Sequence, residues 1–247
     1  MVRKSLEGSP GLVRWLTNAY RGFFVDLDQV VACLPIQPGH TTLLNIGTGD
    51  GVLVSRIARR YPQLCMTTTD ITEHQGWLID DDVRDRIDVQ VHAPEQIAGA
   101  GFGAAFDVVL LSDVVHHVPV EDRASLMTRA WEATSPGGYL VVKDIEDRGF
   151  KARLSLWSDR YLTGDRHTEL IGADAMEALM RQQDPAAQVD RTPLVHQDYP
   201  NYLLVGQRVR SQSHSRTKAL PQVWRTVPAI DFDGLRADVA QVLETNL

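Results

Sequence analysis

Apolar residues recur along this chain with two different periods, and each period predicts a different kind of element. Over residues 10–34, aromatic and aliphatic side chains return every three or four positions, which is typical of an amphipathic helix, and Pro35 ends the pattern. Short apolar runs predict strands at residues 41–46, 66–71, 87–92, 106–112, 139–143 and 199–209. Helical patterns are found at residues 52–61, 121–134 and 172–183.

This alternation of strand and helix predicts an α/β fold with a mostly parallel sheet and helices on both of its faces. The pattern weakens after Asp147, and Asp231 is placed to cap a last amphipathic helix. We therefore expect three parts. They are an N-terminal helical cap or lid at residues 1–40, a main domain at residues 41–209 with an insertion at about 148–185, and a linker with a C-terminal helix at residues 210–247.

A glycine-rich segment, Gly47 to Gly51, follows the first predicted strand. Glycines allow positive φ angles and a close approach of the backbone to a ligand, and ligands bind at the carboxyl ends of strands in open parallel sheets. A dinucleotide fingerprint would require a third glycine where Val52 stands, and no Gly-Lys-Ser/Thr sequence follows as in a P-loop. The spacing therefore disfavours a pyrophosphate site and a nicotinamide oxidoreductase.

The run LLNIGTGDG resembles the first motif of the class I S-adenosylmethionine-dependent methyltransferases, which is an acidic residue, an apolar residue and then G-x-G-x-G. Further landmarks of that family follow in order: Asp70 at the end of the second strand, FDVVLLSDVVHH at residues 106–117, SPGG at residues 135–138 and the late strand at residues 199–209. The resemblance implies a Rossmann-like methyltransferase fold with a seven-stranded sheet. It also implies S-adenosylmethionine as the cofactor.

The same resemblance implies a set of cofactor-binding residues. They are Asn45, Gly47, Thr48, Gly49, Gly51, Asp70, Ile71, Glu95, Ser112 and Asp113. Asp70 would bind the ribose hydroxyls through its two acceptor oxygens, although a simple turn residue is the alternative. Two positions depart from the family pattern. Asn45 lacks the usual negative charge, and His92-Ala93 stands where Gly-Asp is usual, so that Glu95 or Gln96 would have to replace the missing acid.

Two adjacent histidines, His116 and His117, are the candidates for catalysis. A histidine at the end of a strand can serve as a general base near neutral pH, although in this family such histidines also pack or line the pocket. The two side chains cannot both face the same way, and no third ligand lies at a useful spacing, so no metal site is predicted.

Candidate substrate-binding residues are Tyr20, Tyr161, Arg166 and His167. Tyr20 lies on the aromatic N-terminal helix, which could cover an apolar acceptor or pack as core. The other three follow the fifth strand, where this family often inserts substrate-recognition elements, and an ordinary surface loop is the alternative.

Charge and composition narrow the function classes further. The 247 residues carry 25 basic and 32 acidic side chains, a net charge of −7, which argues against a nucleic-acid substrate. No apolar run approaches the ~20 residues of a membrane span, and the first residues lack a signal-peptide pattern, so we expect a cytoplasmic protein. Both cysteines, Cys33 and Cys65, are predicted to be core residues. The terminal helix leaves a homodimer possible.

The resemblance leads us to expect S-adenosylmethionine-dependent methyl transfer to a small or lipid-like acceptor, with O-methylation in secondary or specialised metabolism favoured. The fourth motif reads Leu-Ser-Asp rather than the Asn/Asp-Pro-Pro-aromatic pattern of amino-group methylation. The alternative is a protein of methyltransferase fold that does not transfer methyl, such as a cyclase, another tailoring protein or a binding or regulatory module.

Overall fold

A computed structural model describes residues 25–71, 75–91, 105–147, 168–196 and 199–209. The structural statements below concern these residues. The expected N-terminal lid, the C-terminal helix and five of the predicted site residues lie outside them. Those residues are Tyr20, Glu95, Tyr161, Arg166 and His167.

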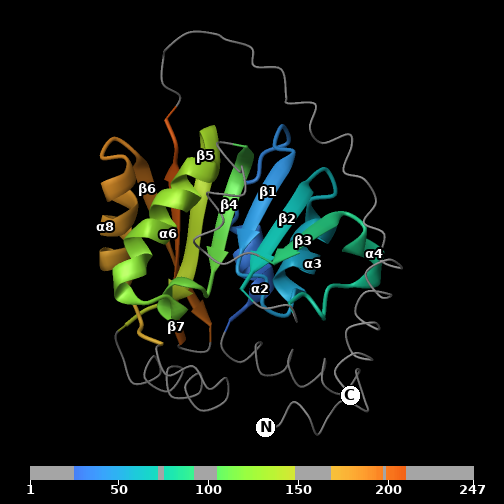
Figure 1. Cartoon of the computed structure of the whole chain (residues 1–247), viewed down its shortest axis with the longest axis horizontal. Coiled ribbons are helices and arrows are strands. Elements are labelled where there is room, and N and C mark those ends of the chain that lie inside the picture. The colour runs from blue at the N-terminus through green and yellow to red at the C-terminus, as the bar shows by residue number, and fades with distance from the viewer. Residues whose placement is uncertain (1–24, 72–74, 92–104, 148–167, 197–198, 210–247) are drawn as a thin grey trace, which may run out of the picture. The chain divides into compact units, whose positions relative to one another are not determined.

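The described residues form one seven-stranded sheet with the strand order β3-β2-β1-β4-β5-β7-β6 (Figure 1). The strands are β1 (Thr42–Ile46), β2 (Cys65–Asp70), β3 (Ile87–Val91), β4 (Phe106–Ser112), β5 (Thr134–Ile145), β6 (Gln188–His196) and β7 (Tyr199–Gln207). The first five are mutually parallel, whereas β7 runs antiparallel to β5 and β6 antiparallel to β7. This arrangement confirms the predicted α/β class and the mostly parallel seven-stranded sheet.

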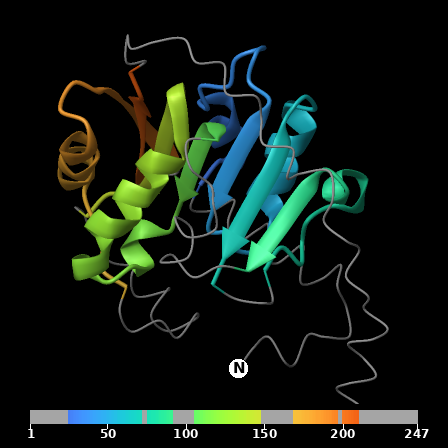
Figure 2. The same cartoon turned by 45° about the horizontal axis from the view of Figure 1, so that its top comes forward.

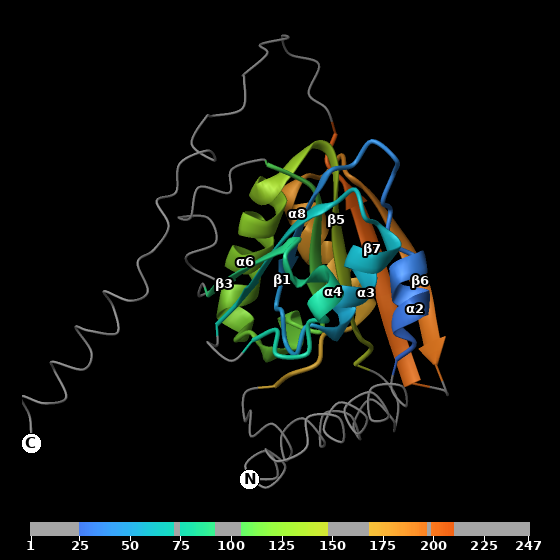
Figure 3. The same cartoon turned by 90° about the vertical axis from the view of Figure 1, so that its right-hand side faces the viewer.

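Helices cover both faces of this sheet (Figure 3). One face carries α2 (Leu27–Ala32), α3 (Val52–Arg60) and α4 (Asp81–Arg84), and the other carries α6 (Val120–Ala133) and α8 (Ala173–Gln183). Most residues of the central strands β1 and β4 are apolar, because both faces of these strands are buried. Leu43 packs on the side of α2 and α3, for example, and Leu44 on the side of α6.

Several elements differ from the prediction, each for a local reason. In its described part, the helix predicted over residues 10–34 is confirmed over Leu27–Ala32, but Val25 and Asp26 are not helical. The Asp26 carboxylate accepts the backbone N–H groups of Asp28 and Gln29, so that α2 begins at Leu27. Strand β6 was missed because its sequence is polar. It is the last strand of the sheet and pairs with β7 on one side only.

The cysteine prediction also fails in part. Cys33 is half-buried against the apolar cluster beneath α2 and α3, but Cys65 is exposed at the start of β2. An apolar neighbourhood in sequence does not show whether a residue at a strand end reaches the core. Separately, no helix in the described ranges combines the length and the apolar character needed to cross a bilayer.

The parallel strands all end on the same side of the sheet, so that their carboxyl ends lie next to one another (Figure 2). At their opposite ends, the Asp107 carboxylate joins β4 to the start of β1 by accepting the N–H groups of Thr41 at 2.8 Å and Thr42 at 3.0 Å. Burial alone would raise the pKa of Asp107, but these hydrogen bonds outweigh it and lower the pKa.

We therefore expect Asp107→Ala to lower the free energy of unfolding by about 1–3 kcal/mol at pH 7, because two backbone donors lose a charged acceptor. A carboxyl whose pKa is lowered by folding stabilises the fold above its unfolded pKa of about 3.9, and this stabilisation is lost as the pH falls through the folded value. The difference from wild type should thus narrow below about pH 4. Urea unfolding at several pH values measures it.

Asp190→Ala is the matched control, since Asp190 is an exposed carboxylate on β6. Its effect should stay within about 0.5 kcal/mol at every pH. A loss in Asp107→Ala that does not change with pH would contradict the role of its charge.

Candidate active site

The loop between β1 and α3 takes a backbone shape that requires glycine. Gly47, Gly49 and Gly51 have φ angles of +87°, +55° and +90°. A Cβ atom at Gly47 would lie 2.2 Å from Cγ2 of Val114, and one at Gly51 would lie 2.4 Å from Cγ1 of Ile79. The glycine loop therefore packs at Gly47 against the turn that follows β4 and at Gly51 against the segment before α4, and a side chain at either position would push the loop away from its neighbour.

Asp70, at the end of β2, holds the middle of this loop. One of its carboxylate oxygens, Oδ2, accepts the backbone N–H of Gly49 at 2.9 Å. The next residue, Ile71, is 67% exposed. A carboxylate that can bind hydroxyls beside an exposed apolar side chain is the combination that a nucleoside requires.

Asn45 supplies a second sign that the loop accepts a ligand. Its side chain is buried behind the loop, and its Oδ1 atom has no hydrogen-bond partner among the described residues. A buried acceptor without a donor is costly, and a donor on a bound ligand would remove that cost. The glycine cradle, Asp70 and Asn45 therefore fit a ligand that carries hydroxyl groups and a hydrogen-bond donor.

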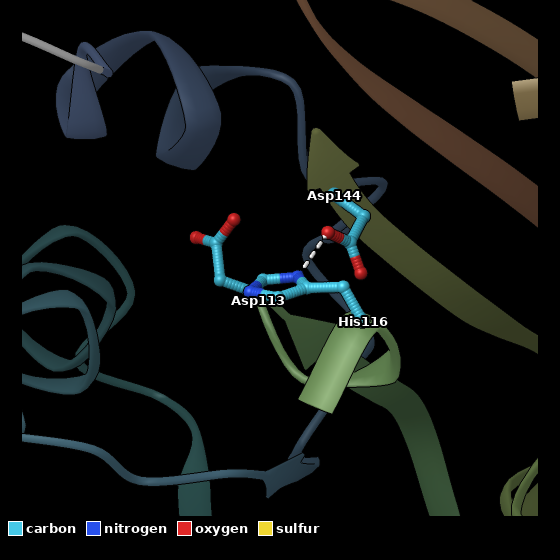
Figure 4. Close-up of side chains that lie close together, drawn as sticks. All are labelled: Asp113, His116 and Asp144. Atoms are coloured by element: carbon cyan, nitrogen blue, oxygen red, sulfur yellow. Dashed lines mark hydrogen bonds and ion pairs between the residues drawn. The ribbon is translucent and has the colours of Figure 1, made fainter. Parts of the chain in front are cut away.

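Figure 4 shows a second group of polar side chains, at the carboxyl ends of β4 and β5. His116 lies in a short 3₁₀ helix, Val115–His117, and its Nδ1 atom is 2.5 Å from Oδ1 of Asp144 near the end of β5. Both side chains are buried, with 2% and 0% exposed. Burial alone would raise the pKa of Asp144, but the charge and hydrogen bond of His116 outweigh it, and the pKa of this carboxyl lies below its usual value.

A buried lysine completes the group. The Nζ atom of Lys143 lies 2.6 Å from Oδ1 of Asp113, and the Lys143 side chain is 2% exposed. Asp113 has a φ angle of +56°, which is uncommon for a residue other than glycine but tolerated by aspartate. The bond from its N–H to the Lys143 carbonyl at 2.9 Å and the ion pair hold it in this conformation.

The two neighbouring histidines occupy different environments, as predicted from their adjacency. His117 is exposed, its ring centre is 4.1 Å from that of His116, and its Nδ1 lies 3.4 Å from the Thr168 hydroxyl. In the described part of the chain, His116 is paired with the Asp144 carboxylate. That both histidines are candidate bases stays a prediction, and the buried pair with Asp144 is a feature of His116.

Asp144 and Lys143 were missed in the sequence because they lie far along the chain from His116. The available signal was the parallel pairing of the two strands, which puts their carboxyl ends side by side. Asp113, His116 and Asp144 can each offer one atom within 4.8 Å of the others, so they could also hold a metal ion. The Lys143 ammonium on Asp113 opposes a cation at this position.

The sequence matches the family described as "Methyltransferase domain" over residues 18–184. This chain belongs to that family. The match covers most of the chain and includes the glycine loop, Asp70 and the His116–Asp144 pair. This membership identifies residues 18–184 as a methyltransferase domain.

Solved structures with the same fold include several methyltransferases. An O-methyltransferase family protein from Burkholderia thailandensis matches with a TM-score of 0.62 and 21% identity over 75% of this chain and 56% of its own. The mitomycin 7-O-methyltransferase MmcR matches with a TM-score of 0.61 and 21% identity over 83% of this chain and 60% of its own. A methyltransferase from Archaeoglobus fulgidus matches with a TM-score of 0.61 and 13% identity over 78% of this chain and 99% of its own. The chain thus spans little more than half of the first and second of these proteins.

We expect Gly47→Ala to weaken binding of the product S-adenosylhomocysteine at least about tenfold, because the new methyl group would displace either Val114 or the loop. Gly39→Ala is the matched control, since a Cβ at Gly39 meets no atom within 4 Å. Isothermal titration calorimetry on both variants, with circular dichroism as a check of folding, tests this. Equal affinities in the two variants would contradict the assignment of the loop.

Proposed function

We propose that this methyltransferase transfers methyl to a hydroxyl group of a small organic acceptor, with His116 as the general base. The observation that carries the proposal is the buried hydrogen bond between His116 and Asp144 at the edge of the sheet that also bears the glycine loop. A hydroxyl is a weak nucleophile until it loses its proton, so O-methylation benefits from a base at this position.

S-adenosylmethionine, when bound, supplies a methyl group on a positively charged sulfur that is already electrophilic. Asp70 would bind the ribose hydroxyls of the cofactor, Ile71 would lie against its adenine ring, and Asn45 would accept a hydrogen bond through Oδ1. The backbone of the glycine loop would line the cofactor between them. The described residues then have to align the acceptor and remove its proton, rather than activate the methyl group.

Asp144 prepares His116 for this task. Its Oδ1 atom accepts from Nδ1 of the imidazole and also from the N–H of Ile145 at 2.8 Å, which holds the carboxylate in one orientation. With the proton on Nδ1, the other ring nitrogen, Nε2, is the one that can accept a proton from a substrate. Asp144 is thus a positioning residue, and it stabilises the imidazolium that forms.

The charges around His116 favour the same step. Asp113 and Asp144 carry two negative charges, and Lys143 carries one positive charge. These three groups together are therefore negative by one unit, and a proton on His116 brings the cluster to neutrality. Since unbalanced charge is costly beside the buried Asp144 and Lys143, this charge distribution favours a proton on His116.

Two solved structures of the same fold support a small acceptor that carries a hydroxyl group. One is a mitomycin 7-O-methyltransferase, and an O-methyltransferase family 2 protein from Planctomyces limnophilus was solved with apigenin. We propose an acceptor of similar size that carries a phenol or another hydroxyl. His117 and Thr168, which lie next to His116, would contact it. The predicted substrate contacts of Tyr20, Tyr161, Arg166 and His167, the cytoplasmic location and a homodimer stay predictions.

We expect His116→Ala to lower kcat by about 10²- to 10⁴-fold, because the acceptor proton loses its base. Affinity for S-adenosylhomocysteine should stay within about twofold, since His116 does not hold the glycine loop. Asp144→Asn should lower kcat in the same direction, because the amide can no longer stabilise an imidazolium. The measurement is formation of S-adenosylhomocysteine with a panel of phenols, hydroxyquinones and aliphatic alcohols.

His117→Ala is the matched control, and its kcat should fall less than about tenfold. Equal losses in the two histidine variants would contradict the choice of His116. If wild type binds S-adenosylmethionine tightly but methylates no member of the panel, the alternative of a methyltransferase fold without methyl transfer gains support.

A metal-dependent reaction at the same cluster makes a different prediction. Because Lys143 already neutralises Asp113 and Asp144 occupies Nδ1 of His116, we expect dialysis against EDTA to leave turnover within about twofold of its starting value. Loss of turnover that Mg²⁺ or Zn²⁺ restores would show instead that Asp113, His116 and Asp144 bind a metal.

A further inference from the structure

A buried chain of polar side chains lies behind the glycine loop and joins β1, β2 and β3. Nδ2 of Asn45 donates to Oγ1 of Thr68 at 3.0 Å, the hydroxyls of Thr68 and Thr48 are 2.7 Å apart, and Thr48 donates to Oε1 of Gln75 at 2.7 Å. Nε2 of Gln75 then donates to the carbonyl of Gln90 on β3 at 2.7 Å. Asn45, Thr48 and Thr68 are all nearly inaccessible, with 1%, 5% and 0% exposed.

The hydrogen bonds that link these side chains can point in only one direction, from Asn45 towards Gln90. The Gln90 carbonyl accepts from the Gln75 amide nitrogen, so the Gln75 oxygen faces Thr48 and takes the only hydroxyl proton that Thr48 has. Thr48 must then accept from Thr68, whose only proton is used in that bond. Thr68 can therefore only accept from the side chain at position 45.

The second hydrogen bond of Asn45 also requires a donor at this position. Nδ2 of Asn45 also donates to the carbonyl of Gly47 in the glycine loop at 3.1 Å. Both contacts of this nitrogen are thus oxygens with no proton to offer. An ionised carboxylate in its place would face two acceptors and meet repulsion, whereas an amide satisfies both.

From this geometry we propose that Asn45 is a positioning residue, whose neutral amide starts a one-way hydrogen-bond chain that holds the glycine loop on β2 and β3. The inference deepens the proposed function, since it explains how the loop that would line the cofactor keeps its shape. It also explains why this position, which the family resemblance assigns to an acidic residue, carries an amide here. The shape of the loop is then independent of pH at this position.

The test is Asn45→Asp, compared with wild type between pH 6 and pH 8. Near pH 6 the introduced carboxyl, buried among acceptors, is partly protonated and can donate to one of the two oxygens that the amide binds. At pH 8 it is ionised and repels both oxygens. We expect the thermal unfolding midpoint of the variant to fall relative to wild type as the pH rises. Its affinity for S-adenosylhomocysteine should be lower than that of wild type by about tenfold or more at pH 8, and by less at pH 6.

Other ionisable groups on the surrounding elements cancel in this comparison. Asp50 and Asp70 lie in and beside the loop, and Asp113, His116 and Lys143 follow from β4 and β5. All are present in both proteins, so the ratio of variant to wild type reports the introduced carboxyl. Asn45→Ala is the matched control, because it removes the donor without adding an acid, and its losses should be equal at both pH values.

A double variant tests the direction of the chain. Thr48→Val removes the acceptor that binds the Thr68 proton, so that Thr68 becomes able to donate to a carboxylate at position 45. The unfolding midpoint should therefore drop no more than about half as far when Asn45→Asp is made in the Thr48→Val background as in wild type. This background also keeps the test valid if Asn45→Asp alone does not fold at pH 8.

The outcomes separate this inference from the proposed function. The unfolding midpoint is measured without cofactor, so it tests the chain even if wild type binds no S-adenosylhomocysteine, a result that would overturn only the proposed function. A difference between Asn45→Asp and wild type that does not change with pH overturns the inference. A midpoint that responds to pH while the affinity ratio does not overturns the positioning of the loop.

Discussion

The parallel pairing of β4 with β5 continues to the last residue of β4, where Ser112 lies opposite Lys143. The residues that follow Ser112 therefore meet the end of β5. This register places Asp113 beside Lys143 and His116 beside Asp144. A buried charge without a partner costs several kcal/mol, so the paired charges are tolerated in this interior only because the two strands keep this register.

The site is built from two groups of residues on neighbouring strands, since β1 pairs with β4. In the first, the glycine loop is held to β2 by Asp70 and by the chain of hydrogen bonds that begins at Asn45. In the second, β4 and β5 carry the His116–Asp144 and Asp113–Lys143 pairs. Val114 packs on Gly47, where a Cβ atom would be only 2.2 Å away, and this contact joins the two groups. Glycine at position 47 thus decides how closely the loop that would hold the cofactor approaches the proposed base.

Periodicity predicted every strand of the described sheet except β6. Strand β4 was predicted with its observed bounds, because a strand between two layers of helices is rich in apolar residues, as its run Val108–Leu111 is. Strand β6 has only one strand beside it, and its sequence is too polar to be distinguished from a loop. The start of α2 depends on the Asp26 cap, which interrupts a helical pattern without changing its periodicity.

The sequence by itself determined the α/β class, the position of the glycine loop and the two histidines as candidate bases, because these depend on local patterns and on short motifs. Only the tertiary structure decided that His116 is the buried histidine, that Asp144 is its partner and that Lys143 balances Asp113. It also decided that the side chain at position 45 must donate to Thr68 and to the Gly47 carbonyl. The physical reason is that burial and the direction of hydrogen bonds are set by atoms from several strands, which no stretch of neighbouring residues contains.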